Sequence, residues 1–87
     1  DYIGKWRGET DTDGSAAFLT IEDDEASFTY IDHERTTTSY TGSYSIANNQ
    51  IIINDLASNS PVTIPFEMKD GKLILTYNAK PIPLTKQ

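Results

Sequence analysis

Regular alternation of side-chain character across residues 39–56 constrains the fold of this chain more than any other feature. In the segment 39–46, large or small apolar positions alternate with serine and threonine, which is typical of a strand with one buried and one exposed face. Asn48 and Asn49 suit a tight turn because asparagine tolerates left-handed backbone. Three consecutive isoleucines at 51–53 then indicate a central strand covered on both faces. We therefore predict a β-hairpin here.

Short alternating segments and turn signals continue along the rest of the chain. Asp13-Gly14 and Asp70-Gly71 are strong hairpin turn signals, and no stretch of ten or more residues has helical periodicity. The half-strand 36–39 is rich in threonine and buries little, so we expect it to lie exposed or at a sheet edge. The predicted strands span residues 3–9, 16–22, 26–32, 36–46, 51–56, 62–68, 73–77 and 81–85.

Eight short antiparallel strands with large residues on one face predict an all-β single domain, residues 1–87, that curls into a small up-and-down barrel. An SH3-like or sandwich meander is the alternative. Eight strands enclose an interior just wide enough for side chains, so we expect a filled core, or at most a shallow pocket lined by tyrosines at one mouth. The side chains expected to point inward are Trp6, Leu19, Ile21, Phe28, Tyr30, Tyr40, Tyr44, Ile46, Ile51, Ile53, Val62, Ile64, Phe66, Met68, Leu73, Leu75, Tyr77, Ile82 and Leu84.

The charge of the chain excludes one class of partner. The net charge is −6, and nine acidic residues but no lysine or arginine lie between Gly8 and Glu34. Phosphate would be repelled by such a surface, so we exclude nucleic acid. There is no cysteine, and therefore neither a disulfide nor a thiolate metal site. The longest apolar run is far short of the roughly 20 residues that span a bilayer. Since the chain begins at Asp1 rather than methionine, we expect a mature form or a domain of a longer protein.

Two motifs resemble those of lipocalins and their relatives. Gly4-Lys5-Trp6 matches the Gly-x-Trp signature that opens lipocalins, and avidin-type barrels as well. The segment 42–46, Gly-Ser-Tyr-Ser-Ile, followed by a turn and the isoleucines 51–53, resembles the hairpin of small lipocalin-like domains. Such domains recur in secreted and surface-anchored bacterial proteins. The order of the parts agrees over most of the chain.

The chain also departs from true lipocalins, which are much longer and carry a C-terminal helix. The family places a basic residue over the tryptophan late in the chain, a position that Lys80 or Lys86 would take. The resemblance implies a barrel fold and export, and hence a secreted or cell-surface location. It carries over neither a ligand nor a catalytic residue.

The polar residues do not form a pattern typical of catalysis or metal binding. The sole histidine, His33, lies in a predicted turn, where an acid–base catalyst would have neither a pocket nor an orienting partner. The acidic segments 11–15 and 22–25 do not fit the ligand pattern of an EF-hand, so we expect solvated turns. We predict a protein that is not an enzyme and has no cofactor or metal.

In a meander, alternate turns lie at the same end of the sheet, and one end would include the longest loop, residues 57–61. We predict binding at that end, by Asp11, Asp13, Asp32, His33, Glu34, Asp55, Ser58, Asn59 and Asn78.

The expected function is a non-catalytic, exported lipocalin-like module, monomeric, that supports binding or display on a bacterial surface or secreted protein. Its partner would be a protein or a small molecule. One alternative is a small secreted protease inhibitor that presents the loop 57–61 to an active-site cleft. The other is a carrier of a small hydrophobic ligand, which would require a measurable internal void.

Overall fold

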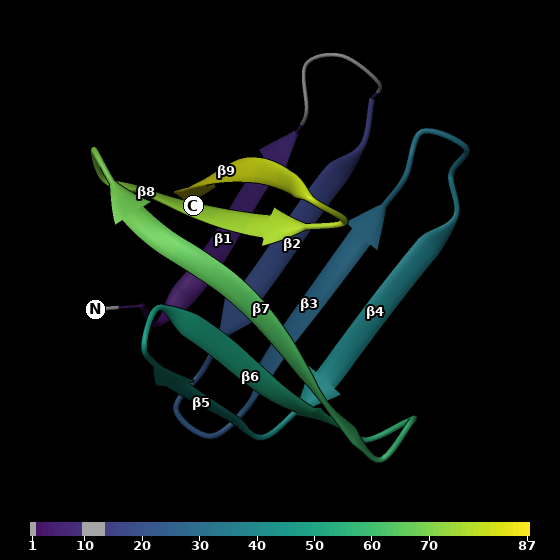
Figure 1. Cartoon of the computed structure of the whole chain (residues 1–87), viewed down its shortest axis with the longest axis vertical. Helices are drawn as coiled ribbons and strands as arrows, with labels where there is room; N and C mark the ends of the chain where they lie inside the picture. The colour runs from purple at the N-terminus through teal and green to yellow at the C-terminus, as the bar shows by residue number, and fades with distance from the viewer. Residues whose placement is uncertain (1, 10–13) are drawn as a thin grey trace.

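The computed structural model describes residues 2–9 and 14–87, and the regular structure within these residues is entirely β-strand (Figure 1). Within the same residues, no helix is long and apolar enough to cross a bilayer. The strands are β1 (Gly4–Glu9), β2 (Ala16–Ile21), β3 (Ala26–Ile31), β4 (Thr37–Gly42), β5 (Tyr44–Ala47), β6 (Gln50–Asp55), β7 (Ser60–Lys69), β8 (Lys72–Tyr77) and β9 (Lys80–Lys86).

The strands form one antiparallel sheet that curls into a nearly closed barrel. Their order is β4-β3-β2-β1-β9-β8-β7-β6-β5, a meander in which the first strand, β1, also pairs with the last, β9. That pairing is short, with Trp6 opposite Lys86 and Arg7 opposite Thr85, as expected for a last strand that carries two prolines without N–H groups. The predicted all-β barrel is confirmed.

The described residues form nine strands rather than the predicted eight, because the predicted strand 36–46 is bent at Ser43 into β4 and β5. The bend brings β4 unusually close to β6. A Cβ added at Gly42 would lie 1.8 Å from the carbonyl oxygen of Asn54, so only glycine permits this approach. Beyond it, the N–H of Asn54 donates to the C=O of Ser43 at 2.8 Å. Contact between β4 and β6 completes most of the barrel wall.

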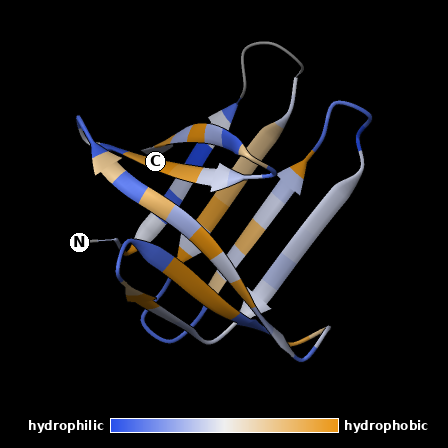
Figure 2. Ribbon diagram, viewed as in Figure 1, coloured by the Kyte–Doolittle hydropathy of each residue, from blue (hydrophilic) through white to orange (hydrophobic). Residues whose placement is uncertain are grey.

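The inner faces of the strands form one hydrophobic core, and Figure 2 shows hydrophobic and hydrophilic positions alternating along them. Tyr2, Tyr40, Tyr44, Ile46, Val62 and Tyr77 are partly buried against this core. The buried members, each at most 6% exposed, are Trp6, Ala17, Leu19, Ile21, Ala26, Phe28, Tyr30, Ile51, Ile53, Ile64, Phe66, Leu73, Leu75, Ile82 and Leu84.

The inward-facing residues were predicted correctly apart from Met68, which is 43% exposed. Met68 lies one residue before the end of β7, where the strand runs past the core into the β7–β8 turn. Ala17 and Ala26 are buried but were not predicted, because alanine contributes little to a hydrophobic pattern.

Trp6 anchors β1 in the core. Its indole N–H donates to the C=O of Tyr2 at 3.0 Å, and the Nζ atom of Lys86 lies 5.6 Å from the centroid of its ring. Lys86, rather than Lys80, therefore holds the position over the tryptophan that the resemblance implied. A cation over an indole face is attracted by the ring quadrupole.

Candidate binding site

The predicted site residues Asp32, His33 and Glu34 lie in the β3–β4 turn. The Oδ1 atom of Asp32 accepts hydrogen bonds from the N–H groups of Glu34 and Thr36, both at 2.9 Å. The carboxylate thus satisfies backbone donors of its own turn. His33 and Glu34 are exposed.

Asp55, Ser58 and Asn59 lie at the end of β6 and in the β6–β7 turn. Oδ1 of Asp55 accepts from the N–H of Thr41 at 3.0 Å, and Oδ2 accepts from the N–H and the hydroxyl of Ser58 at 3.0 and 2.8 Å. The Ser58 hydroxyl, followed by the backbone N–H groups of Thr41 and Ser58, lowers the pKa of Asp55 although burial opposes this. Asp55, only 5% exposed, therefore links the β6–β7 turn to β4 through its carboxylate.

The structure does not bring these two groups of residues together. Thr41, which contacts Asp55, pairs with Ser27 beside the β2–β3 turn, whereas the β3–β4 turn adjoins the opposite end of β4. The bend after Gly42 changes the direction of the second half of the meander, so alternate turns no longer share one end (Figure 1). Asn78 lies in the β8–β9 turn. The remaining two predicted residues, Asp11 and Asp13, fall outside the described residues.

Beside the first part of β4, three tyrosines form a cluster against the core. The rings of Tyr30 and Tyr77 lie 4.9 Å apart between centroids, and the hydroxyls of Tyr40 and Tyr77 are 3.5 Å apart. Burial, together with the Tyr40 hydroxyl, raises the pKa of Tyr77 to about 12. These rings join β3 and β4 to the end of β8 across the interior.

The barrel wall has a gap beside the first part of β4, residues 37–40. β4 pairs with β3 along its whole length, but β6 reaches β4 only from Thr41, whose C=O accepts the N–H of Leu56 at 2.9 Å. Among the described residues, none pairs with the other side of residues 37–40, and we call this side the open edge of β4. Figure 1 shows it at the right of the barrel. The predicted edge position of the half-strand 36–39 is confirmed.

The pairing pattern decides which backbone groups point to the open edge. The N–H of Asp32 donates to the C=O of Thr36 at 3.0 Å. Because bonded and non-bonded pairs alternate along an antiparallel ladder, residues 38 and 40 also bond to β3. Thr37 and Ser39 therefore direct their N–H and C=O groups away from β3, as Thr41 does. Both are exposed, so their backbone groups are available to a partner.

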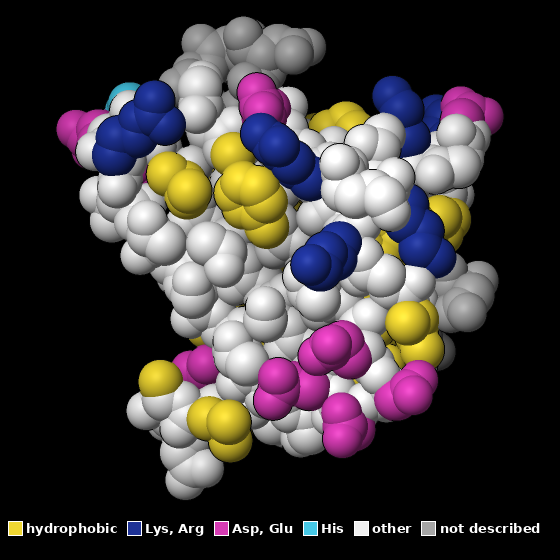
Figure 3. All heavy atoms as spheres, turned by 180° about the vertical axis from the view of Figure 1, so that it is seen from behind, with side chains coloured by type: hydrophobic (Ala, Val, Ile, Leu, Met, Phe, Trp, Pro, Cys, Tyr) yellow, Lys and Arg dark blue, Asp and Glu magenta, His cyan; other side chains and the backbone are white. Residues whose placement is uncertain are grey.

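Acidic side chains lie beyond the Gly42 end of the open edge. Gly42 pairs with Ala26, so the β2–β3 turn, with exposed carboxylates at each position from 22 to 25, adjoins this end of β4. Figure 3 shows Asp and Glu side chains gathered low on the rear face, and a hollow in the outline between the β3–β4 and β6–β7 turns. A depression of about 300 Å³ lies around Asp55, lined by Ser43, Asn54, Asp55, Leu56, Asn59, Ser60 and Pro61.

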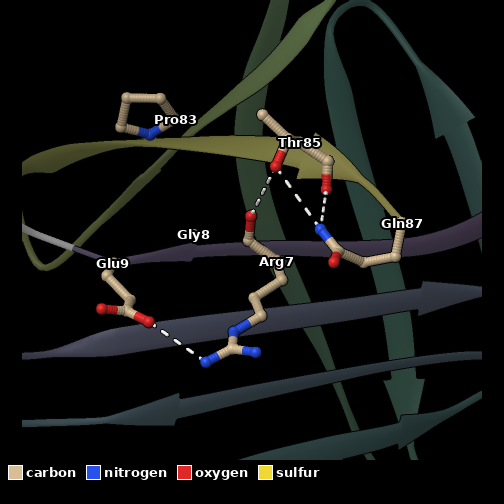
Figure 4. A pocket seen from close by; sticks show the side chains of 6 residues that line it. All are labelled: Arg7, Gly8, Glu9, Pro83, Thr85 and Gln87. Atoms are coloured by element: carbon tan, nitrogen blue, oxygen red, sulfur yellow. Dashed lines mark hydrogen bonds and ion pairs between the residues drawn. The ribbon is translucent and has the colours of Figure 1, made fainter.

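A second depression, of about 390 Å³, lies outside the wall between β1 and β9 (Figure 4). Its polar side chains contact one another: Arg7 pairs with Glu9 at 3.1 Å, and the amide nitrogen of Gln87 donates to the C=O of Thr85 at 2.9 Å. The Thr85 hydroxyl donates to the C=O of Arg7 at 3.4 Å. Since these groups already have partners, the open edge of β4 is the stronger candidate.

Sequence reasoning identified the exposure of the half-strand 36–39 but not its role as a candidate site. The signal was the run of threonine and serine without a large apolar side chain. The direction of the free backbone groups could not be predicted, because it depends on the register in which β4 pairs with β3.

No protein-family model matches the sequence, and a search of curated proteins finds no match. Three solved structures match the fold. A lipocalin lipoprotein affecting virulence in Streptococcus pneumoniae has a TM-score of 0.64 and 18% identity, over 99% of this chain and 92% of that one. A lipocalin-like protein from Bacteroides uniformis has a TM-score of 0.54 and 19% identity, over 98% and 97%. An uncharacterized protein from Bacteroides eggerthii has a TM-score of 0.57 and 15% identity, over the whole of both chains. The chain therefore has the fold of bacterial lipocalin-like domains.

Proposed function

We propose that this chain is a non-catalytic binding module of an exported bacterial protein, either secreted or held at the cell surface, and that it binds its partner on the outside of the barrel. The location is supported by the likeness to a Streptococcus pneumoniae lipoprotein that covers 99% of the chain. The net charge of −6 supports a monomer, because like-charged copies repel one another.

The observation that carries the proposal is the packing of the interior. The inward apolar side chains of β2, β6 and β9 are 0–1% exposed, as are Leu73 and Leu75 of β8. They occupy the space that a buried ligand would need. A useful ligand pocket has a volume of roughly 300 Å³ or more. The depressions described above lie on the outer surface, among strand edges and turns. This packing supports binding on the outer surface.

The titratable side chains support a role without catalysis. A pKa of about 12 keeps the Tyr77 hydroxyl protonated at neutral pH, so it is a poor general base. The Asp55 carboxylate is engaged by Ser58 and Thr41, and His33 is exposed in a turn. None of these side chains is both activated and oriented toward a cavity.

Two measurements test this function. We expect saturating oleate or anilinonaphthalene sulfonate to leave the melting temperature of the chain unchanged, because neither can enter a filled core. A melting temperature that rises with ligand concentration would instead identify the chain as a carrier of a small hydrophobic ligand. For the location, we expect protease added to intact cells of the source bacterium to degrade the parent protein, or the parent protein to be found in the medium. Protection until lysis would contradict export.

Protease inhibition is the second candidate function, and the exposure of Leu56 favours it. Leu56 is 74% exposed at the start of a turn that Asp55 holds through Ser58. An ordered turn with an exposed leucine suits the specificity pocket of a protease. We expect an inhibitor to lose inhibition with Leu56→Asp and keep it with Asn59→Ala. Absence of inhibition across serine, cysteine and metalloproteases would remove this candidate.

A further inference from the structure

We propose that the open edge of β4, residues 37–40, binds an extended peptide segment that carries basic residues at one end and adds to the sheet as another strand. The inference rests on the proposed function, binding by the outer surface, and names the class of partner.

The backbone supplies the first part of the argument. Thr37 and Ser39 direct N–H and C=O groups outward in the spacing that an antiparallel or parallel partner requires. Natural proteins protect exposed edges with lysine, proline or bulges, yet the open edge itself carries only threonine, serine and tyrosine. The edge is therefore ready for pairing.

The surroundings define the side chains that the peptide needs. On the inner face of an added strand, side chains would meet Tyr40, which is half-buried, and the Tyr77 hydroxyl beside it. An aliphatic or aromatic residue fits this contact. At the far end of the edge, Leu56 is held next to Thr41 by its N–H bond and offers a second apolar contact. The central residues of the peptide should therefore alternate between apolar and polar.

Charge selects one end of the peptide and disfavours a second copy of the chain. The β2–β3 turn places four exposed carboxylates, residues 22–25, beyond one end of the edge. The turn at the other end carries both Glu34 and Arg35, so it selects neither sign of charge. Lysine or arginine at one end of the peptide would face the four carboxylates. Two copies of the chain, each with net charge −6, would instead bring like charges together.

Amide hydrogen exchange on the intact chain tests the proposal. The probe is a synthetic nine-residue peptide with alternating valine and threonine in the middle. It has two lysines at each end, so that one pair faces the carboxylates whichever way the strand runs. In the free protein, we expect fast exchange at the amides of Thr37 and Ser39 and slow exchange at those of Thr38 and Tyr40, which bond to β3. Added peptide should slow exchange at Thr37 and Ser39 specifically. A peptide with N-methylated central amides should not, because it lacks the donors.

A matched pair of variants separates backbone pairing from side-chain contact. Ser39→Pro removes the outward N–H, which β3 does not use, so the fold should tolerate it, and we expect peptide affinity to fall roughly tenfold or more. Ser39→Ala removes only the hydroxyl that bonds to Thr29 and should change affinity less than about twofold. Should Ser39→Pro fail to fold, the exchange pattern of the unmodified chain still decides the question.

Four results would overturn the inference. These are no added protection at Thr37 and Ser39, equal protection by the N-methylated peptide, equal binding of a peptide with glutamates in place of the lysines, and protection that appears without peptide as protein concentration rises. The last would identify a second copy as the occupant. Peptide binding mapped to another outer surface would overturn the edge site and leave the proposed function standing, whereas entry of oleate into the core would overturn that function itself.

Discussion

Replacing Gly42 with alanine tests the bend between β4 and β5. A Cβ at this position would lie 1.8 Å from the oxygen and 2.8 Å from the carbon of the Asn54 carbonyl, and these backbone atoms cannot rotate away. Ordinary contact is about 3.5 Å, so β4 and β6 must separate by roughly 1.5 Å. This separation would break the bonds that Ser43 and Thr41 accept from β6.

The expected loss follows from these contacts. Each lost backbone hydrogen bond costs about 1 kcal/mol net, and forced repacking adds about 1–3 kcal/mol. The sum, about 3–5 kcal/mol, is a large part of the roughly 4–13 kcal/mol expected for 87 residues. We therefore expect Gly42→Ala to be severely destabilised or unfolded at room temperature.

Urea unfolding followed by the fluorescence of Trp6, the single tryptophan, measures this loss. Gly71→Ala is the matched control, because a Cβ there meets nothing within 4 Å although φ is +78°. Left-handed backbone alone costs alanine about 1 kcal/mol. If Gly42→Ala loses no more stability than Gly71→Ala, then the close approach of β4 to β6 does not hold the bend, and the reasoning is wrong.

Three further predictions concern titration and exposure. The folded state lowers the pKa of Asp55 below 3.8, so its stabilising effect is complete above about pH 5 and is lost as pH falls through the folded pKa. In urea unfolding, the decrease in the free energy of unfolding from pH 7 to pH 3 should therefore be smaller for Asp55→Asn than for the unmodified chain. Folding shifts the pKa of Tyr77 in the opposite direction, from 10.0 to about 12, so the free energy of unfolding should decrease as pH rises between those values. This decrease, measured by unfolding at pH 9 and pH 11.5, should be smaller for Tyr77→Phe. Leu56→Ser should change stability by no more than about 0.5 kcal/mol in thermal unfolding, since the side chain is 74% exposed; a larger loss would mean that Leu56 packs in the fold.

Most of the strands could be predicted because alternation with period two is a local property of the chain. Each residue of β3 or β8 faces in or out according to its own hydrophobicity, as Phe28 and Leu75 do at 0% exposure. The tight turns could be predicted for the same reason, because they depend on the residues within each turn. Asn48 and Asn49 have φ of 52° and 59°, and Asp70 and Gly71 have φ of 53° and 78°, the left-handed values that these residue types accept.

The candidate site could be predicted only in part. The lack of large apolar side chains marked residues 36–39 as an exposed edge. Asp55 was predicted to bind a partner, but the fold directs its carboxylate to Thr41 and Ser58. Its binding role remains a prediction that these contacts do not test. A polar residue in a turn has the same sequence pattern whether it faces water or a distant strand.

The sequence by itself determined that this chain forms short antiparallel strands with one apolar face, because side-chain hydrophobicity and turn chemistry act between near neighbours. Tertiary structure alone decided that one predicted strand bends at Ser43 and that β6 meets β4 only beyond residue 40. Both depend on the contact of Gly42 with Asn54, which continues the pairing of β5 with β6 beyond Tyr44 and Ile53 and cannot be read from the alternation of either strand. The open edge, and with it the proposed site, is a consequence of that contact between strands.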